Sequence, residues 1–424
     1  MARKRLLVVG AGAKAAAIVA RAAVLRRLVG EDHVPEIIVF EKDQIGAAWN
    51  GHANFSSGFL TLCTPGEKDV GFPYTEVHGR RRRPAVSPLL FSRFSWSAYL
   101  VDKLAYSAWI DRGRAHPTHR DFADYLAWVF ERAENPPSIG EVTSITPGLG
   151  DKFVIDTSSA RGENQFVVDG VVLTGTGQAR MLKTKDCPPN DRMLTAETFW
   201  SARDEVKAIA RGQVAVLGAG GAAGTIMAWL AEQFAETEND IFSISPMGTL
   251  FARGDGYTER RWFSDPSDWT RLSKSHRQEI IDRTEGGVIS LRNKKSIDSS
   301  NRITFFQGKV IEVRPDDDDP ERLSLRIRYG NSYERVAVDY VVSAIGFDTW
   351  GMIDLLAIPP RLRDGKMRDR VIEKLEPNLS LPRSLAYPPG IHFPALGGML
   401  YGPGIGSLSA LGDMAERVMR PYMT

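Results

Sequence analysis

RLLVVGAGAKAAA, residues 5–17, is the stretch that decides the fold. The leucines and valines of its first half are typical of a buried parallel strand. The motif Gly10-x-Gly12-x-x-Ala15 follows directly. Residues 14–29 are rich in alanine, leucine and arginine, which favour a helix. The stretch therefore predicts a strand, a glycine turn and a helix in immediate succession.

A second apolar run, residues 36–40, ends at Glu41. Strand, glycine turn, helix, strand and terminal acid together form the fingerprint of a βαβ unit that binds a dinucleotide. The glycines let a diphosphate approach backbone N–H groups at the positive end of the helix. Glu41 can accept hydrogen bonds from ribose hydroxyls, which suits the adenosine of FAD.

The N-terminus also permits a different interpretation, because the basic start MARKR before an apolar, alanine-rich run resembles a secretory signal. Lys14, Arg21, Arg26 and Arg27 interrupt the apolar character, so the run is too short to cross a membrane. We therefore favour the strand and turn, and we expect no membrane partner and a cytoplasmic location.

The same pattern returns in the second half of the chain. Residues 213–217 form a short apolar strand, and Gly218-x-Gly220-x-x-Ala223 follows it. A helix is predicted over 225–234 and a strand over 241–244. The second strand ends without a carboxylate. Because a carboxylate there would repel a 2′-phosphate, its absence makes this unit suitable for NADPH.

Two βαβ units predict an α/β fold with two Rossmann-like dinucleotide-binding domains. Residues 171–177 and 341–348 each end a strand with small residues. Each is interpreted as a connection from a second sheet back into a nucleotide-binding domain. We expect a discontinuous FAD-binding domain, residues 1–209 and 339–424, into which an NADPH-binding domain, residues 210–338, is inserted. Residues 303–313 and 323–338 are each predicted to be a strand in the inserted part.

Thirteen positions in and around the two turns are candidate cofactor-binding residues, and Ser245 and Arg253 are those expected near a 2′-phosphate or adenine. Arg253 could equally form a surface ion pair, and Trp49 could simply pack in a core. The candidates are Gly10, Gly12, Ala15, Glu41, Lys42, Trp49, Gly218, Gly220, Ala223, Ser245, Arg253, Gly346 and Leu408.

Composition excludes several other classes of protein. The chain has 54 Lys+Arg and 52 Asp+Glu, a net charge of +2, so no basic field points to nucleic acid. Its two cysteines, Cys63 and Cys187, are too far apart in sequence for a Cys-x-x-Cys redox pair. His116-x-x-His119 lacks a carboxylate at ligand spacing, so we expect no metal site.

Baeyer–Villiger oxygenases carry a Phe-x-Gly-x-x-x-His segment near their second nucleotide motif. Phe306-x-Gly308 begins in this way, but Glu312 stands where the histidine is required.

Several longer strings are more specific than the glycine motifs. They are VVGAGAKA (8–15), EKDVGFPY (67–74), WIDRGR (109–114), PTHR (117–120), TGTGQA (174–179), FSDPSDW (263–269), GPG (402–404) and LS (408–409). On these strings the chain resembles the flavin-dependent N-hydroxylating monooxygenases of siderophore biosynthesis, and most closely the mycobactin-type lysine N6-monooxygenases.

The resemblance implies FAD, NADPH, O₂ and a primary amine substrate, L-lysine or a related amino acid. It implies that a C4a-hydroperoxyflavin carries the chemistry, so no side chain is expected to be catalytic. Lys68 matches the family lysine that contacts the substrate carboxylate. Substrate contacts are expected within residues 253–300, and a homo-oligomer is implied as well.

Two departures from the family pattern, Arg260 and Glu285, leave the substrate open, and a third, Gly221-Ala222, concerns the affinity for the cofactor. Arg260 and Glu285 stand at two substrate-binding positions where the family has asparagine, and Gly221-Ala222 replaces a polar pair. A guanidinium differs from an amide in charge and reach. Another amine, such as ornithine or a diamine, is therefore an alternative substrate. A non-oxygenating NADPH-dependent flavoprotein is the alternative outside this class.

Overall fold

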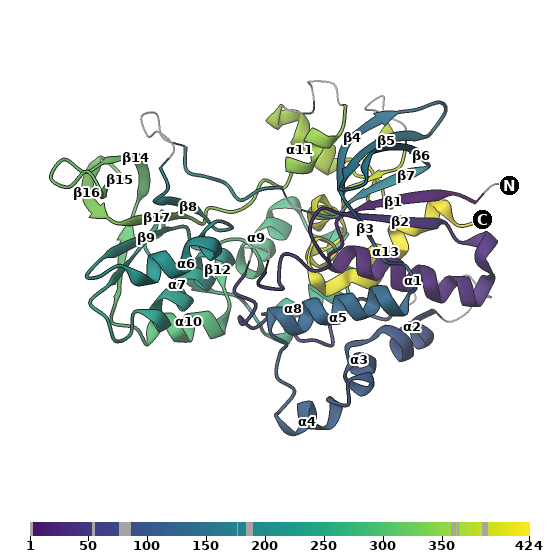
Figure 1. The fold of residues 1–424 in the computed structure, drawn as a ribbon, viewed down its shortest axis with the longest axis horizontal. Coiled ribbons are helices and arrows are strands. Elements are labelled where there is room, and N and C mark those ends of the chain that lie inside the picture. The colour runs from purple at the N-terminus through teal and green to yellow at the C-terminus, as the bar shows by residue number, and fades with distance from the viewer. Residues whose placement is uncertain are drawn as a thin grey trace. The chain divides into compact units, whose positions relative to one another are not determined.

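The structure, a computed structural model, divides into two compact units. The first comprises residues 1–176, 260–277 and 349–424, and the second comprises residues 177–259 and 278–348 (Figure 1). The structure describes residues 3–52, 56–75, 86–175, 177–183, 190–357, 362, 364–383 and 389–424.

The first unit is built on a parallel sheet in the order β18-β7-β1-β2-β3. Its strands are β1 (Arg5–Val9), β2 (Glu36–Glu41), β3 (Ser138–Ile139), β7 (Gly170–Leu173) and β18 (Ile391–His392). Strand β1 lies in the middle, where it pairs with β2 on one side and β7 on the other. Helix α1 (Ala13–Val29) starts after the glycine turn. The predicted strand, turn and helix are confirmed.

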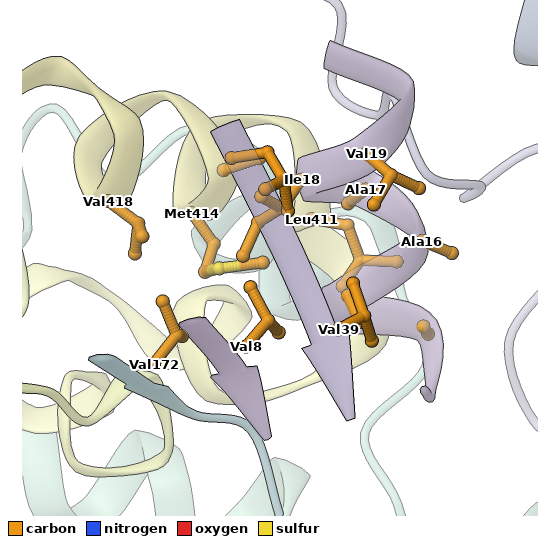
Figure 2. Packing of buried hydrophobic residues seen from close by; sticks show 14 of the residues in the cluster. Val8, Ala16, Ala17, Ile18, Val19, Val39, Val172, Leu411, Met414 and Val418 are labelled. Atoms are coloured by element: carbon orange, nitrogen blue, oxygen red, sulfur yellow. The ribbon is translucent and has the colours of Figure 1, made fainter. Parts of the chain in front are cut away.

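Helix α1 is buried on most of its circumference, and its run of alanines explains why. Small side chains let neighbouring elements approach closely, and α2 (Val86–Phe94), α5 (His119–Arg132) and α13 (Leu411–Met419) all pack against it. Figure 2 shows Val8 and Val172 of the sheet facing Met414 and Val418 of α13. The last helix of the chain thereby completes the core that the first strand begins.

The remaining elements of the first unit lie around this core. They are α3 (Trp96–Asp102), α4 (Tyr106–Asp111), α11 (Gly365–Glu373), α12 (Gly398–Tyr401) and an antiparallel sheet of β4 (Glu141–Pro147), β5 (Phe153–Ser159) and β6 (Gly162–Val168). Helices α8 (Tyr257–Ser264) and α9 (Lys274–Thr284) cross the boundaries between the units.

The second unit holds the second βαβ pattern in a parallel sheet of the order β13-β10-β9-β17-β8. Its strands are β8 (Met193–Thr195), β9 (Gln213–Leu217), β10 (Asp240–Ser245), β13 (Ile303–Gln307) and β17 (Tyr340–Ser343). Its other elements are α6 (Phe199–Ala208), α7 (Gly221–Gln233), α10 (Leu291–Asp298), the short pair β11 (Phe251–Ala252) and β12 (Val288–Ile289), and the antiparallel β14 (Lys309–Pro315), β15 (Leu323–Tyr329) and β16 (Ser332–Val338).

The two long predicted strands after β10 are each two strands. Gly308, with φ +151°, separates β13 from β14, and a side chain there would meet Ile327. Gly330, with φ +56°, forms the turn between β15 and β16. The prediction was wrong at these glycines, because both take backbone angles that an L residue rarely adopts.

The unit boundaries also differ from the predicted segments. Strand β17 pairs with both β8 and β9, so residues 177–209 and 339–348 join the second unit rather than the first. Residues 260–277 lie in the first unit instead of the second. Pairing between strands distant in sequence determines these boundaries, and local patterns do not reveal it.

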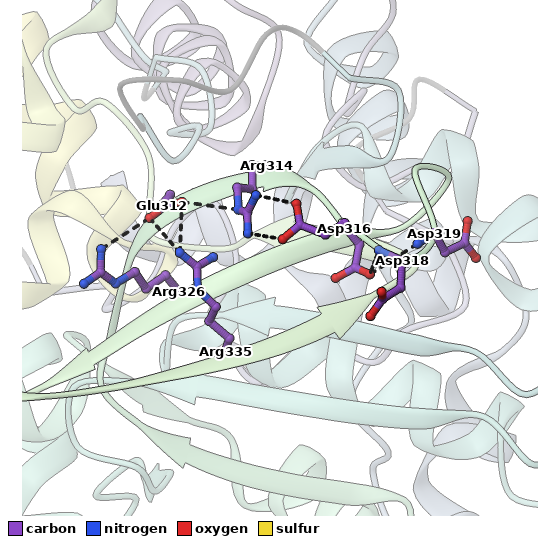
Figure 3. Close-up of polar contacts among 8 residues, drawn as sticks. Glu312, Arg314, Asp316, Asp318, Asp319, Arg326 and Arg335 are labelled. Atoms are coloured by element: carbon purple, nitrogen blue, oxygen red, sulfur yellow. Dashed lines mark hydrogen bonds and ion pairs between the residues drawn. The ribbon is translucent and has the colours of Figure 1, made fainter.

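The antiparallel sheet of the second unit carries an ion-pair network, shown in Figure 3. Glu312 contacts the guanidinium groups of Arg314, Arg326 and Arg335 at 3.3–3.6 Å. Arg314 also forms two hydrogen bonds to Asp317, which hold the pKa of that exposed carboxyl below its usual range. Glu312 thus links three strands of the sheet, and it contacts arginines at the position where Baeyer–Villiger oxygenases require a histidine.

Within the described ranges, no helix combines the length and the apolar character that crossing a bilayer requires.

The C-terminal end of the first unit is fixed by a buried histidine. His392 is fully buried; its Nδ1 lies 2.8 Å from the Asn378 carbonyl and its Nε2 lies 2.7 Å from the Tyr422 hydroxyl. These distances fit a neutral ring that donates from Nδ1 and accepts at Nε2. Burial lowers the pKa of His392 to about 4.

We predict that this histidine makes the fold sensitive to acid. The pKa of His392 is lower in the folded than in the unfolded protein. The stability that neutral His392 contributes is therefore present above about pH 6.5 and is lost as pH falls towards 4. Urea unfolding between pH 4.5 and 6.5 measures the free energy of unfolding. In His392→Gln, the slope of this free energy against pH should be smaller by up to about 1.4 kcal/mol per pH unit. The exposed His276 is the control, and His276→Gln should leave the slope unchanged. Equal slopes for wild type and His392→Gln would contradict the assignment.

Candidate functional site

The first glycine turn leaves the start of α1 open. Gly10 has φ +97°, its N–H donates to the Phe40 carbonyl at 2.7 Å, and a Cβ there would lie 2.7 Å from Thr174 Oγ1. Gly12 is the N-cap of α1; it has no side-chain cap, and a Cβ on it would meet nothing within 4 Å. The first N–H groups of a helix have no acceptor within the helix. The turn therefore presents donors to an anion, and Ala15 is buried behind it.

Glu41 is held beside this turn by two backbone donors. Its Oε2 accepts from the Ala11 N–H at 2.8 Å, and its Oε1 accepts from the Asp43 N–H at 3.0 Å. A carboxylate has about four acceptor positions, so two remain for hydroxyl groups of a ligand. Lys42 is exposed next to it. Trp49 packs edge-on against Phe122 at 5.1 Å, as expected for the core interpretation.

The second turn repeats this geometry in the second unit. Gly218 has φ +121°, donates to the Ile244 carbonyl at 3.0 Å, and could not carry a Cβ without meeting Ala344. Gly220 is the N-cap of α7, with no side-chain cap and no acid in the first turn. The helix begins four residues before the predicted start, immediately after the turn. Ala223 is buried like Ala15.

Strand register makes Ser245 the counterpart of Glu41. Val9 pairs with Phe40, and Leu217 pairs with Ile244, so the next residue in each unit occupies the same position. Ser245 is 2% exposed, and its Oγ has no hydrogen-bond partner among the described residues. A buried hydroxyl without a partner costs free energy, so this position suits a ligand that supplies one.

Arg253 and Glu285 lie together in the second unit. Their closest nitrogen and oxygen are 3.7 Å apart, and the side chains are 24% and 33% exposed. The Arg253 Nε is buried without a partner among the described residues. The backbone N–H of Arg253 donates to Ile289 of β12. Gly346, with φ +96°, follows β17 in the same unit.

Lys68 lies in the first unit beside aromatic rings. Its Nζ is 5.4 Å from the ring centre of Phe72, 6.0 Å from that of Phe263 and 3.5 Å from Ser409 Oγ. Arg260 precedes Phe263 by one turn of α8. Leu408, next to Ser409, packs against the core. The structure thus brings Lys68 together with α8 and the C-terminal segment, whereas Glu285 belongs to the other unit.

The sequence did not identify Asp69, which anchors the Lys68 loop. This carboxylate is 1% exposed and accepts from the Gly71 N–H at 3.0 Å, the Tyr74 hydroxyl at 2.6 Å and the Trp96 N–H at 2.8 Å. Burial raises its pKa to about 7, against the lowering effect of these hydrogen bonds. Only the surrounding α3 and α5 reveal this role, because an aspartate in a polar string gives no sign of burial.

Comparison with known proteins now identifies the family. The family model described as L-lysine 6-monooxygenase/L-ornithine 5-monooxygenase matches residues 90–349. The L-lysine N6-monooxygenase MbtG of Mycobacterium tuberculosis is 34% identical over 98% of this chain and 94% of that protein.

The chain belongs to the lysine/ornithine N-monooxygenase family.

Two solved structures of related enzymes share the fold. The lysine monooxygenase NbtG from Nocardia farcinica has a TM-score of 0.79 and 29% identity, and the match covers 98% of this chain and all of that one. The ornithine N-hydroxylase KtzI from Kutzneria sp. 744, in a structure with reduced FAD, NADP⁺ and L-ornithine, has a TM-score of 0.74 at 17% identity and 99% coverage of both chains. The predicted α/β class and the predicted family are confirmed.

We predict that Tyr74→Phe lowers the stability of this chain, because the Tyr74 hydroxyl donates to the buried Asp69 carboxylate. The variant removes one hydrogen bond to a buried carboxylate, which contributes about 1.5–3 kcal/mol. Urea unfolding measures the change. Tyr106→Phe is the control, because that side chain is 40% exposed. Unchanged stability in Tyr74→Phe would show that the Tyr74 hydrogen bond to Asp69 does not stabilise the fold.

Proposed function

We propose that this chain is an FAD- and NADPH-dependent monooxygenase that hydroxylates the side-chain amine of L-lysine, or of a related amino acid, in siderophore biosynthesis. The observation that carries the proposal is the pair of open glycine turns, one ending at a carboxylate and the other at a serine. Family membership supplies the reaction class.

The residues at the first turn fit FAD. Gly10 and Gly12 leave room for a diphosphate at the start of α1, and Glu41 retains acceptors for ribose hydroxyls. Bound flavin supplies the oxygen chemistry, which side chains alone cannot perform. The protein's contribution is binding, orientation and the exclusion of water from the reacting groups.

The residues at the second turn fit NADPH. Ser245 occupies the position of Glu41, so no carboxylate there repels a 2′-phosphate, and its Oγ gains the hydrogen bond it lacks. Arg253 is the cation of this site, held by Glu285. A guanidinium binds phosphate well. NADPH is therefore preferred over NADH.

The Lys68 ammonium is the group that binds the substrate carboxylate. It lies beside Ser409 and the aromatic rings of Phe72 and Phe263, where an amino acid can be held by its carboxylate. Glu285 is paired with Arg253, so it adds no uncompensated negative charge for an ammonium. The substrate amine must be neutral to react, and an apolar surrounding lowers its pKa and favours that form.

The test is an amine panel scored for hydroxylamine with saturating FAD. We expect L-lysine to be turned over faster than L-ornithine or the diamine cadaverine, and NADPH to be used in preference to NADH. Lys68→Ala should raise KM for L-lysine by about tenfold or more, because a charge-assisted contact to the carboxylate is lost. It should leave KM for the diamine almost unchanged, since a diamine has no carboxylate.

Three outcomes would contradict parts of the proposal. Equal effects of Lys68→Ala on lysine and diamine would remove the carboxylate role. Faster oxidation of a diamine would change the substrate class. NADPH oxidation that yields only hydrogen peroxide with every amine would favour a non-oxygenating flavoprotein. The homo-oligomer, implied by the family resemblance, and the cytoplasmic location, expected from the N-terminal sequence, stay predictions.

A further inference from the structure

Lys14 lies in the first turn of α1, two residues after the N-cap Gly12. Its Nζ donates to the Thr174 carbonyl at 3.2 Å. That carbonyl is neutral, and the first turn of α1 contains no acid. Lysine at this place is unexpected from helix physics, because the helix dipole disfavours a cation at the N-terminal end.

Partial burial of the Lys14 side chain makes the position less favourable still. Desolvation lowers the pKa of Lys14 to about 8. An ammonium with three donors and a single neutral acceptor is poorly compensated when it is removed from water. In the free protein this side chain should therefore weaken the fold. A ligand that binds the folded state and pairs with such a group stabilises the fold.

The surroundings of Lys14 place it at the first glycine turn. Thr174 follows β7, and its hydroxyl donates to the Val9 carbonyl at the end of β1 at 2.6 Å. The same hydroxyl lies 2.7 Å from where a Cβ on Gly10 would be. The Lys14 ammonium therefore lies over the carboxyl ends of β1 and β7, which is the edge where open α/β sheets bind ligands.

We propose that Lys14 binds the diphosphate of FAD through a charge-assisted hydrogen bond, and that it lowers the stability of the FAD-free protein. The inference rests on the proposed function and extends it to a residue that the glycine fingerprint does not include. Ammonium-to-phosphate hydrogen bonds are among the stronger ones. With the anion bound, its charge compensates both the desolvation of the Lys14 ammonium and the unfavourable interaction of that ammonium with the helix dipole.

The test compares Lys14→Met with wild type in two measurements on the full chain. Methionine keeps the length and removes the charge. The Kd for FAD, measured on the FAD-free protein by flavin fluorescence, should rise about tenfold or more and depend less on salt. The Tm of the FAD-free protein should rise by about 2 °C or more, because an uncompensated cation is gone.

Two controls separate charge at the site from other effects. Riboflavin has no phosphate, so its Kd should be the same for wild type and Lys14→Met. Lys103→Met removes an exposed lysine of the same unit and should change neither Kd nor Tm. Lys14→Ala provides a second variant, in which Kd and Tm should shift in the same directions.

The inference is overturned if Lys14→Met and Lys14→Ala bind FAD as wild type does. It is also overturned if both lower the Tm of the FAD-free protein, because Lys14 would then be a structural tie to Thr174. If wild type itself binds no FAD, the proposed function fails together with this inference. If wild type binds FAD and only the Lys14 effect is absent, the proposed function stands.

Discussion

The structure depends on two helix starts whose N-cap residue, a glycine in each, provides no side-chain cap. Helices α1 and α7 both start at a glycine N-cap without a side-chain cap and without an acid in the first turn. Each is preceded by a glycine at positive φ that donates to the end of the neighbouring strand. A helix end of this kind is stabilised by an anion. The arrangement in both units is therefore the one expected of a dinucleotide site, while the reaction class comes from family membership.

Much of this could be predicted from the sequence because the deciding features are local. The strand, turn and helix at residues 5–29 follow from side-chain type and glycine spacing, and Glu41 and Ser245 follow from their places at strand ends. The break at Gly308 was missed because apolar residues lie on both sides of it, whereas Gly330-Asn331 is a hairpin signal that the sequence does carry. The unit boundaries were missed because β8, β9 and β17 pair across long stretches of sequence.

The parts of the site that sequence reasoning missed are those defined by burial. Asp69 becomes an anchor only when its neighbours in the fold, among them the Trp96 N–H of α3, supply donors to it. Lys14 becomes an unfavourable cation only when the fold desolvates it at the start of α1, where the Thr174 carbonyl is a neutral acceptor. Arg253 and Glu285 were both singled out from the sequence, but their pairing depends on how β11 and the end of α9 meet. Chemical type is visible in a sequence, whereas the compensation of each charge is a property of the fold.

The proposed reaction uses NADPH to place one atom of O₂ on a substrate amine. Turnover of L-lysine with NADPH under oxygen-18 gas, with mass analysis of the product, tests it most directly. We expect a hydroxylamine that carries a single oxygen-18 atom from the gas. The proposed reaction would be contradicted if NADPH were consumed while all the label appeared in hydrogen peroxide and the amine stayed unmodified.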